Sequence, residues 1–300
     1  MNPHYIPPDR FPMELTPRIR VLGNYFFNLF LVTGSEKAAL FESGISGGVD
    51  TVIQQLDDLE IAPDYLVVSH PHSDHITGLP GLMERFPGAE VVCGRGAQEF
   101  VSHPKAGPAL VREDKFMSQG LEKMGIRPGR PTLETIPDLS RAVSVDSPAR
   151  LNLGGGTDLL LTPAEGHSPG NLIAQVEKDR ALFCSDSMGF HYPGRMFWPL
   201  FFTDARAYVK TIDLIAAAAP DILAPAHQGP ITGDRVRKGI DLARRTTLDI
   251  IRRIRETQLP DDELTGELFE ESYRDEFTLY TRENILNCTR LLLKRARESA

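Results

Sequence analysis

An apolar run that ends in a dense polar cluster constrains this chain more than any other part of its sequence. The segment DYLVVSH at 64–70 predicts a strand buried on both faces, as in a sheet with covered sides. His70, His72, Asp74 and His75 follow its apolar part directly. Four such groups beside a buried strand destabilise a fold unless they find partners. We therefore interpret the cluster as a site rather than as core packing.

The residue types and spacing of this cluster fit a metal site. Residues two apart in an extended segment point the same way, so His70 and His72 can converge on one point. Asp74 and His75 begin the next turn and can converge on a neighbouring point. Imidazole and carboxylate ligands hold zinc or iron while leaving a position open for water. Two adjacent metal positions are therefore expected at the end of this strand.

Four ligands do not complete two metal sites, so other strand ends must supply the rest. Three candidates occupy such positions: His167 in the loop AEGHSPGN, Asp186 at the end of ALFCSD, and His227 at the end of DILAPAH. Ligands gather at the carboxyl ends of strands in α/β sheets. We expect these three residues to lie beside the 70–75 segment. Five of the eight histidines of the chain belong to this set.

The remaining patterns predict an α/β fold. Apolar and alternating runs predict strands, and apolar residues three or four apart predict helices. Besides 64–70, strands are expected at 24–32, 38–44, 90–94, 158–166, 171–177, 181–186 and 221–227. Helices are expected near 49–60, 79–86, 115–124 and 204–220. Residues 1–17 are rich in proline and are expected to form an irregular lead-in.

The composition changes near Asp234. From there charged residues dominate, Ile and Leu recur at helical spacing, and no further strand is expected. We therefore divide the chain into a catalytic core at 1–234 and a C-terminal helical cap at 235–300. Residues 235–256 hold eight basic side chains. They indicate either a solvated helix face, which we favour, or a surface for the phosphates of a leaving group such as coenzyme A.

Charge and cysteine content limit the partners and the compartment. A net charge of -8 argues against a general nucleic-acid binder or a basic membrane-surface protein. The three cysteines lie far apart without a C-x-x-C pair, which argues against a disulfide framework and fits a reducing cytoplasm. We see no signal peptide or membrane span. We expect a cytoplasmic protein with no nucleic-acid or membrane partner, whose amphipathic terminal helices allow a homodimer.

The motif series HPHSDH, AEGHSPGN, FCSDSMG and PAHQG resembles that of the metallo-β-lactamase-fold hydrolases over residues 20–232. The resemblance implies an αββα sandwich of the α/β (α+β) class with two divalent metal ions, zinc or iron, with manganese a further option. It implies that His70, His72 and His167 hold the first metal. The implied ligands of the second metal are Asp74, His75 and His227, and Asp186 bridges the two. Asp74 is also the implied catalytic residue, which orients the attacking hydroxide and relays its proton.

Two departures from the family pattern refine this expectation. The family usually has an Asp-Thr-Gly-like turn after its second strand, and this chain has Glu42, Ser43 and Gly44, which alters the hydrogen bonds around the metal ligands. No cysteine stands at a ligand position, unlike in β-lactamases that use a cysteine in the second site. The chain is more similar to the branch that contains glyoxalase II, lactonases and thioesterases.

The segment FHYPGRMFWPLFF at 190–202 follows Asp186 and is rich in aromatic residues. We predict that it walls an apolar acyl or aryl pocket, with core packing as the equal alternative. The candidate substrate-binding residues are Phe190, His191, Trp198 and Phe201. Together with ALFESGIS and the helical tail, this segment resembles thioesterases of the 2-aminobenzoylacetyl-coenzyme A type, whose helices close over the active site. That resemblance implies hydrolysis of an acyl-coenzyme A or related thioester, a small-molecule substrate.

Other functions stay open at this stage. The same site could hydrolyse a lactone, another ester or a phosphodiester. A mononuclear-iron persulfide dioxygenase is disfavoured, because the second-site residues His75 and His227 are intact. A regulatory protein that acts through its helical tail, with incidental catalysis, is a non-enzymatic alternative.

Overall fold

The computed structural model describes residues 3–126 and 129–299 of the chain. Within them, two β-sheets pack face to face. The first sheet has the strand order β1 to β7 and changes from antiparallel to parallel pairing at β4. Its strands are β1 (Met13–Thr16), β2 (Ile19–Gly23), β3 (Asn28–Thr33), β4 (Ala38–Phe41), β5 (Tyr65–Val68), β6 (Glu90–Gly94) and β7 (Val143–Val145).

The second sheet has the order β15-β14-β11-β10-β9-β8, with β11 and β14 parallel. Its strands are β8 (Ala149–Asn152), β9 (Asp158–Pro163), β10 (Leu172–Val176), β11 (Ala181–Phe183), β14 (Ile222–Ala224) and β15 (Ile231–Thr232). A separate hairpin joins β12 (Phe190–Tyr192) to β13 (Met196–Trp198).

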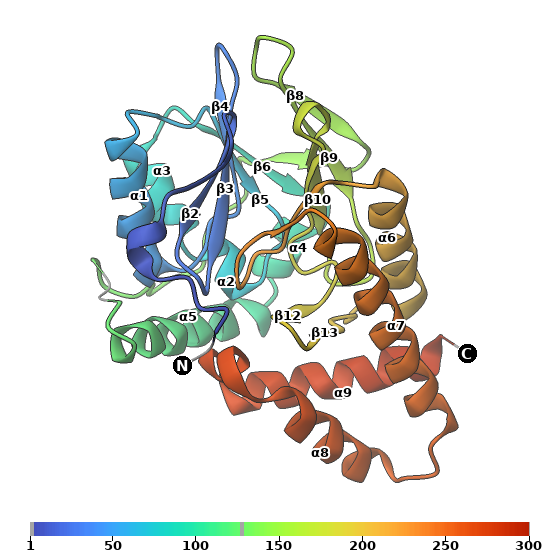
Figure 1. The fold of residues 1–300 in the computed structure, drawn as a ribbon. Helices are drawn as coiled ribbons and strands as arrows, with labels where there is room; N and C mark the ends of the chain where they lie inside the picture. Colours follow the sequence, from blue (N-terminus) through green and yellow to red (C-terminus); the bar gives the residue numbers. More distant parts are fainter. Residues whose placement is uncertain (1–2, 127–128, 300) are drawn as a thin grey trace.

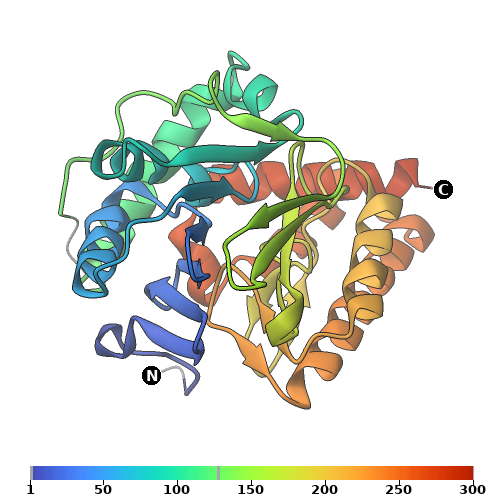
Figure 2. The same cartoon turned by 90° about the horizontal axis from the view of Figure 1, so that it is seen from above.

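Helices cover the outer faces of both sheets (Figures 1 and 2). The first sheet is covered by α1 (Val49–Asp58) and α3 (Leu79–Arg85), whereas α6 (Ala205–Ala218) and α7 (Arg235–Glu256) cover the second. Strand β3 shows how the layers arise, because its successive side chains point to opposite faces of the sheet. Phe30 points between the sheets, and Leu31 points toward α1. The structure confirms the predicted αββα sandwich with C-terminal helices.

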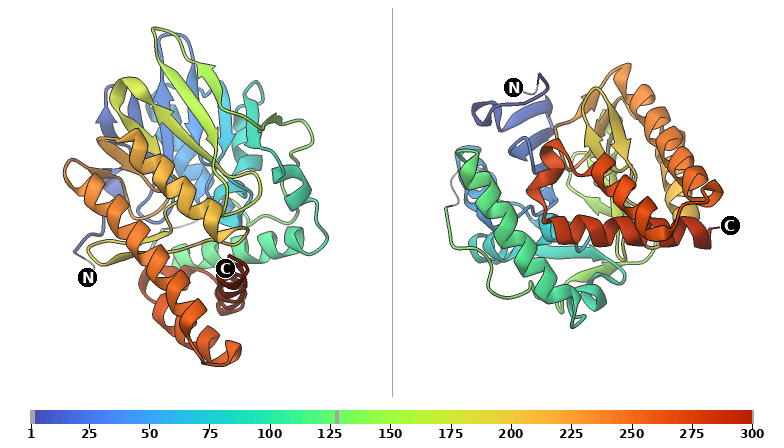
Figure 3. Two further views of the ribbon diagram at one scale, coloured as in Figure 1. Left: turned by 90° about the vertical axis from the view of Figure 1, so that its right-hand side faces the viewer. Right: turned by 90° about the horizontal axis from the view of Figure 1, so that it is seen from below.

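The remaining helices gather at one end of the sandwich. They are the short α2 (Ser73–Ile76) and α4 (Ala97–Val101), α5 (Ala106–Lys123), α8 (Asp261–Ser272) and α9 (Arg282–Glu298). Seen from below, α9 crosses this end beside α5 (Figure 3). Four 3-10 turns complete the described elements: η1 (Pro8–Arg10), η2 (Ser46–Gly48), η3 (Glu177–Asp179) and η4 (Asp275–Leu279). No helix in the described ranges has the length and apolarity needed to cross a bilayer.

The C-terminal helices share a hydrophobic core with the second sheet. Ile240 and Ile251 of α7, Leu268 of α8 and Leu292 of α9 belong to the same buried cluster as Ile212 of α6. Helix α7 begins at Arg235, where the sequence predicts the start of the cap. Because these C-terminal helices and their connections (the tail, 235–299) are buried together with the sheet, the division into a core and a cap stays a prediction.

The N-terminal segment corrects the expected irregular lead-in at 1–17. It contains β1, which pairs with β2 as an edge strand, where the preceding Pro12 is tolerated. The expected strand 24–32 begins only at Asn28. Asn24 Oδ1 accepts hydrogen bonds from the backbone N–H groups of Phe26 (2.9 Å) and Phe27 (3.2 Å), and this turn delays the strand.

The expected helix at 115–124 is longer, because α5 begins at Ala106. Pro108 does not interrupt it, since a first-turn residue needs no N–H partner within the helix. The hairpin β12–β13 and the strands β2, β7, β8 and β15 were not predicted.

Phe183 tests the contact between the sheets. Its ring stacks on Phe30 with centroids 4.9 Å apart, and its side chain has no exposed surface. We expect Phe183→Ala to lower the free energy of unfolding by about 3–5 kcal/mol, because it leaves a cavity between two sheets. Chemical denaturation measures this. Leu248→Ala, at a position 38% exposed on α7, serves as the control and should change stability by less than about 0.5 kcal/mol. Equal effects would contradict the assigned core.

Candidate metal centre

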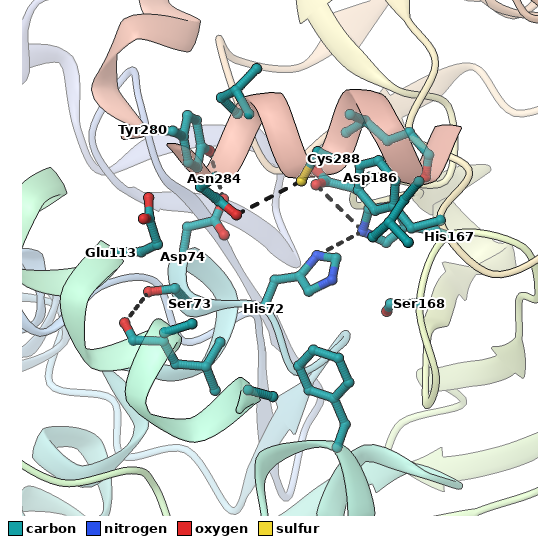
Figure 4. Close-up of a pocket in the computed structure, with 18 of the residues that line it drawn as sticks. His72, Ser73, Asp74, Glu113, His167, Ser168, Asp186, Tyr280, Asn284 and Cys288 are labelled. Atoms are coloured by element: carbon teal, nitrogen blue, oxygen red, sulfur yellow. Dashed lines mark hydrogen bonds and ion pairs between the residues drawn. The ribbon is translucent and has the colours of Figure 1, made fainter. Parts of the chain in front are cut away.

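All the predicted metal-ligand candidates meet at the end of the sandwich that α9 crosses. Their backbone positions follow the ends of strands β5, β9, β11 and β14, and α2 carries two of them. Figure 4 shows four of them, His72, Asp74, His167 and Asp186, around one pocket. Two groups have ligand atoms within 4.8 Å of one another: His70, His72, His167 and Asp186 form the first cluster, and Asp74, His75, His227 and Asp186 form the second.

The first cluster brings three imidazole nitrogens together. His70 Nε2, His72 Nδ1 and His167 Nε2 lie 3.1 Å from one another in each pair. Two nitrogens bound to one zinc at 2.0–2.1 Å in tetrahedral geometry are about 3.3 Å apart. Three mutually close nitrogens cannot all be satisfied by hydrogen bonds to one another. The spacing therefore fits three ligands of a common ion.

The second cluster pairs histidine nitrogens with carboxylate oxygens. Asp74 Oδ2 lies 3.2 Å from His75 Nε2 and 3.3 Å from His227 Nε2. Asp186 also reaches both of these nitrogens, at 3.6 Å and 3.4 Å. Its Oδ2 lies 3.7 Å from His167 Nε2 in the first cluster. Asp186 therefore lies between the clusters, at the position of a bridging ligand.

The outer nitrogens of the histidines fix which nitrogen faces the cluster. His167 Nδ1 lies 2.6 Å from the Leu200 carbonyl oxygen, and His227 Nδ1 lies 2.7 Å from the Phe26 carbonyl oxygen. A carbonyl only accepts, so each Nδ1 carries a hydrogen and each Nε2 of a neutral ring presents a lone pair inward. This arrangement is the one that metal-ligating histidines adopt.

Orphaned atoms test whether the residues fit a metal. The Nε2 atoms of His75 and His227 are buried and have no hydrogen-bond partner. In neutral rings their lone pairs face the carboxylate oxygens of Asp74 and Asp186, which is repulsive unless a proton or a metal ion lies between nitrogen and oxygen. The donor set, with its inward lone pairs, therefore fits divalent ions.

Glu42 supports both clusters from behind. Its Oε2 accepts hydrogen bonds from His75 Nδ1 (2.9 Å) and from Ser69 Oγ (2.7 Å). Ser69 Oγ in turn lies 3.0 Å from His70 Nδ1. Glu42 adopts a left-handed backbone conformation with φ of 82° to reach this position. The turn Glu42-Ser43-Gly44, which departs from the family pattern, thus retains a carboxylate that orients one histidine of each cluster.

Burial and charge set the protonation of the two clusters differently. Burial and the neighbouring His167 lower the pKa of His72 to about 3. Burial also opposes charge on His227, but the adjacent carboxylates of Asp186 and Asp74 outweigh it and raise its pKa to about 9. Burial would raise the pKa of Asp74, yet His75 and His227 hold that pKa well below its usual range. The histidines of the first cluster are therefore neutral, whereas a proton binds the second cluster when no metal does.

A pocket of about 390 Å³ adjoins the clusters. His72, Asp74, His167 and Asp186 lie at its polar end (Figure 4). Aromatic and aliphatic side chains form the rest of the wall, from α4, α5, the β12 region, the loop before α6, and the tail. They include Phe100, Leu110, Phe190, Leu200, Phe202, Phe277, Ile285 and Leu291.

One of the four predicted substrate-binding residues lines this pocket, and three do not. Phe190 is in the wall. His191 points to the opposite face of β12 and stacks on Phe197, with centroids 4.5 Å apart. Trp198 and Phe201 are buried in the core cluster behind the pocket, where Phe201 packs against Tyr208. For Trp198 and Phe201 the structure places core packing where a pocket wall was expected, and His191 is a partly buried residue away from the pocket. Their neighbour Phe202 lines the pocket instead.

Sequence reasoning missed the pocket residues that α5 and the tail supply. Glu113 comes from α5, and Tyr280, Asn284, Cys288 and Arg295 come from the tail. These residues have no ligand-type spacing, and they are far in sequence from the metal motifs. Their local sequence gives no signal either, because the buried face of α5 also carries Asp114 and Ser118, and Tyr280 stands in the polar segment RDEFTLYTREN.

Three of the eight basic residues in α7 have carboxylate partners on the surface. Arg244 pairs with Asp213, Arg252 with Asp249, and Arg253 with Glu267 and Glu271. None of the eight basic residues of 235–256 lines the described pocket. This arrangement favours the solvated helix face over a phosphate-binding surface.

Comparison with known proteins assigns the family. Residues 23–227 match the metallo-beta-lactamase superfamily, and the chain belongs to that superfamily. It is 24% identical over 231 residues to the uncharacterized protein YobT of Bacillus subtilis, covering 73% of this chain and 91% of YobT. It is 27% identical over 171 residues to a coenzyme F420H(2) oxidase of Methanothermobacter marburgensis, covering 55% of this chain and 35% of the oxidase.

Solved structures agree on the fold. The sec-alkylsulfatase Pisa1 of a Pseudomonas species superposes with a TM-score of 0.67 at 18% identity. The match covers 94% of this chain and 49% of the sulfatase chain. At that identity the likeness shows the fold alone. The superfamily assignment and the two His/Asp clusters together suggest a metal-dependent hydrolase, in a fold that typically binds two metal ions.

The shared position of Asp186 predicts unequal effects of two substitutions on metal content. Asp186→Ala removes a group that belongs to both clusters, so we expect well under one bound metal per chain and no hydrolysis. His72→Ala removes a ligand of the first cluster only and should leave about one metal, again without hydrolysis. Elemental analysis of the purified variants measures this. The exposed His103 provides the control, since His103→Ala should bind as much metal as the unaltered protein. Unchanged metal content in Asp186→Ala would contradict the assignment.

The different protonation of the clusters predicts different pH dependence of metal binding. A metal must displace the proton that His227 holds below about pH 9. Apparent affinity at the second cluster should therefore rise between pH 7 and 9, by about tenfold per pH unit for each displaced proton. Affinity at the first cluster should be flat, because His72 is neutral throughout. Competition with a chelator of known pH dependence measures both. Equal slopes for the two metal equivalents would rule out this account.

Proposed function

We propose that this protein is a dinuclear-metal hydrolase that cleaves a thioester of an apolar acyl group. The observation that carries the proposal is the juxtaposition of two His/Asp clusters with one mostly apolar pocket. Substrate-sized pockets bury an apolar ligand and orient it through a few polar groups. Here those polar groups lie at the end where the clusters are.

The chain supplies a complete ligand set for this chemistry. His70, His72 and His167 would hold one ion, and Asp74, His75 and His227 the other, with Asp186 shared. Two divalent ions bound there supply a hydroxide nucleophile at neutral pH and Lewis acidity toward a carbonyl oxygen. Asp74 lines the pocket and also belongs to the second cluster. From that position its carboxylate would orient the nucleophile and relay its proton.

The walls favour a compact apolar acyl or aryl group. Phe190, Phe202 and Phe277 contribute rings, and Ile285 and Leu291 of α9 contribute aliphatic surface. A volume of about 390 Å³ is near the lower end of the range for small-molecule pockets, which is about 300–1,000 Å³. The acyl part of a thioester fits such a space, whereas a large leaving group such as coenzyme A extends beyond it.

The charges in the pocket favour a thiolate leaving group. Asp74 and Asp186 have pKa values held well below the usual range, so neither is a proton donor for a poor leaving group. Burial raises the pKa of Glu113, a third carboxylate of the pocket, but both of its oxygens accept hydrogen bonds from Thr281, which favour its charged form. A thiolate leaves without protonation more readily than an alkoxide does. An oxygen ester or lactone on the same site is the runner-up.

Phosphodiesters fit the pocket less well. Arg295 is the one Arg or Lys among the described pocket residues. Its Nε donates to the Phe202 carbonyl oxygen (3.0 Å), and its guanidinium also pairs with Glu298 (2.6 Å). Few cationic donors are therefore left for an anionic substrate.

The experiment is a substrate panel on the metal-loaded protein. It compares aryl and medium-chain acyl-coenzyme A thioesters, the matched oxygen esters and lactones, and bis(p-nitrophenyl) phosphate. We expect kcat/KM for the thioesters to exceed that for the matched oxygen esters by at least about tenfold, which is about 1.4 kcal/mol in the barrier. Asp186→Ala is the inactive control.

Two results would overturn the proposal. Turnover of the phosphodiester alone would exclude thioester hydrolysis as the function. Oxygen uptake without hydrolysis would favour an oxidase, the activity in the name of the Methanothermobacter relative. An oxygen electrode in parallel with thiol detection distinguishes these outcomes from hydrolysis.

A further inference from the structure

One side chain from the C-terminal tail reaches the second cluster. Tyr280 follows η4, and its hydroxyl donates a hydrogen bond to Asp74 Oδ2 at 2.6 Å (Figure 4). The same oxygen lies 3.2 Å and 3.3 Å from the Nε2 atoms of His75 and His227. It is therefore the oxygen of Asp74 that faces the metal position. Tyr280 is 7% exposed, so water does not compete freely for this bond.

Contacts with the rest of the protein hold Tyr280 in place. The next residue, Thr281, begins α9 as its N-cap, and its N–H and Oγ1 donate to the Glu113 carboxylate of α5 at 3.0 Å and 2.5 Å. The hydroxyl of Tyr273 donates to the carbonyl oxygen of Tyr280 at 2.9 Å. Phe277 packs on the ring, with centroids 5.4 Å apart. The phenol is thus held toward Asp74 by α5 and by the tail.

We propose that Tyr280 is a positioning residue for the second metal ion, acting through Asp74. A carboxylate oxygen can accept one hydrogen bond and still offer a lone pair to a cation. The phenol restricts the rotation of the Asp74 carboxylate and holds this oxygen toward His75 and His227. Loss of a hydrogen bond to a metal ligand typically lowers metal affinity by about 10–100-fold. The inference rests on the proposed metal centre.

The hydrogen bond from Tyr280 would couple docking of the tail to metal binding at the second cluster. If docking of the tail strengthens metal binding at the second cluster, metal binding must strengthen docking of the tail by the same factor. Among the described residues, Tyr280 is the tail side chain with a hydrogen bond to a cluster residue. Substituting it should therefore uncouple the tail from the metal while leaving the fold unchanged.

The test titrates metal-free full-length protein with Zn²⁺ against a chromophoric chelator. In Tyr280→Phe we expect the second equivalent to bind about 10–100-fold more weakly, and the first to change by less than about twofold. Tyr192→Phe is the matched control, because it removes a hydrogen bond from a buried tyrosine of the core to the Ser272 carbonyl oxygen in the tail. It should leave both equivalents within about twofold of the unaltered protein.

A second readout follows the tail itself. Hydrogen exchange of the backbone amides at 281–292 should slow when Zn²⁺ loads the unaltered protein, and should slow less in Tyr280→Phe. Binding of both equivalents by Tyr280→Phe as in the unaltered protein would overturn the inference. Equal weakening in Tyr192→Phe would also overturn it, by assigning the effect to the tail as a whole. Absence of Zn²⁺ binding in the unaltered protein would instead overturn the metal centre on which the inference rests.

Discussion

The arrangement of this protein depends on one constraint: buried imidazole and carboxylate groups face one another and need a positive charge between them. Imidazole lone pairs and carboxylate oxygens converge at the end of the sandwich with almost no exposure to water. The outer nitrogens of His167 and His227 donate to backbone carbonyls, so the lone pairs cannot turn away. Such an arrangement is repulsive unless protons or metal ions lie within it. Divalent ions bound there would remove this repulsion from both clusters and would supply the site's chemistry.

The supporting residues come from segments far apart in the chain. Glu42, after β4, orients His75 directly and His70 through Ser69. On the opposite side, the tail places Tyr280 on Asp74, and α5 holds the tail through Glu113. The sandwich thus supplies the ligands, while the helices at its end supply the pocket wall and part of the support for the second cluster. The size of the pocket and the hydrogen bond that supports Asp74 both depend on the tail.

The sequence predicts the ligands better than the pocket, for a physical reason. Burying the polar side chains of the 70–75 segment without partners costs free energy, so their presence after an apolar strand indicates a site. His167, Asp186 and His227 stand at or just after strand ends, where ligands gather, so short motifs are enough to identify the set. The pocket wall has no such signature. An apolar residue of α9 such as Ile285 shows the same helical spacing whether it faces a cavity or the core. The alternation of β12 places Phe190 in the wall and His191 behind it, and that register cannot be predicted without the hairpin.

Anomalous diffraction from crystals of the Zn²⁺-loaded protein, recorded on both sides of the zinc absorption edge, tests the central claim most directly. The account predicts two anomalous peaks about 3.5–4 Å apart, one beside His72 and His167, the other beside His75 and His227, with Asp186 between them. The absence of anomalous peaks at this end of the sandwich, or zinc bound only at surface residues, would contradict the dinuclear metal site.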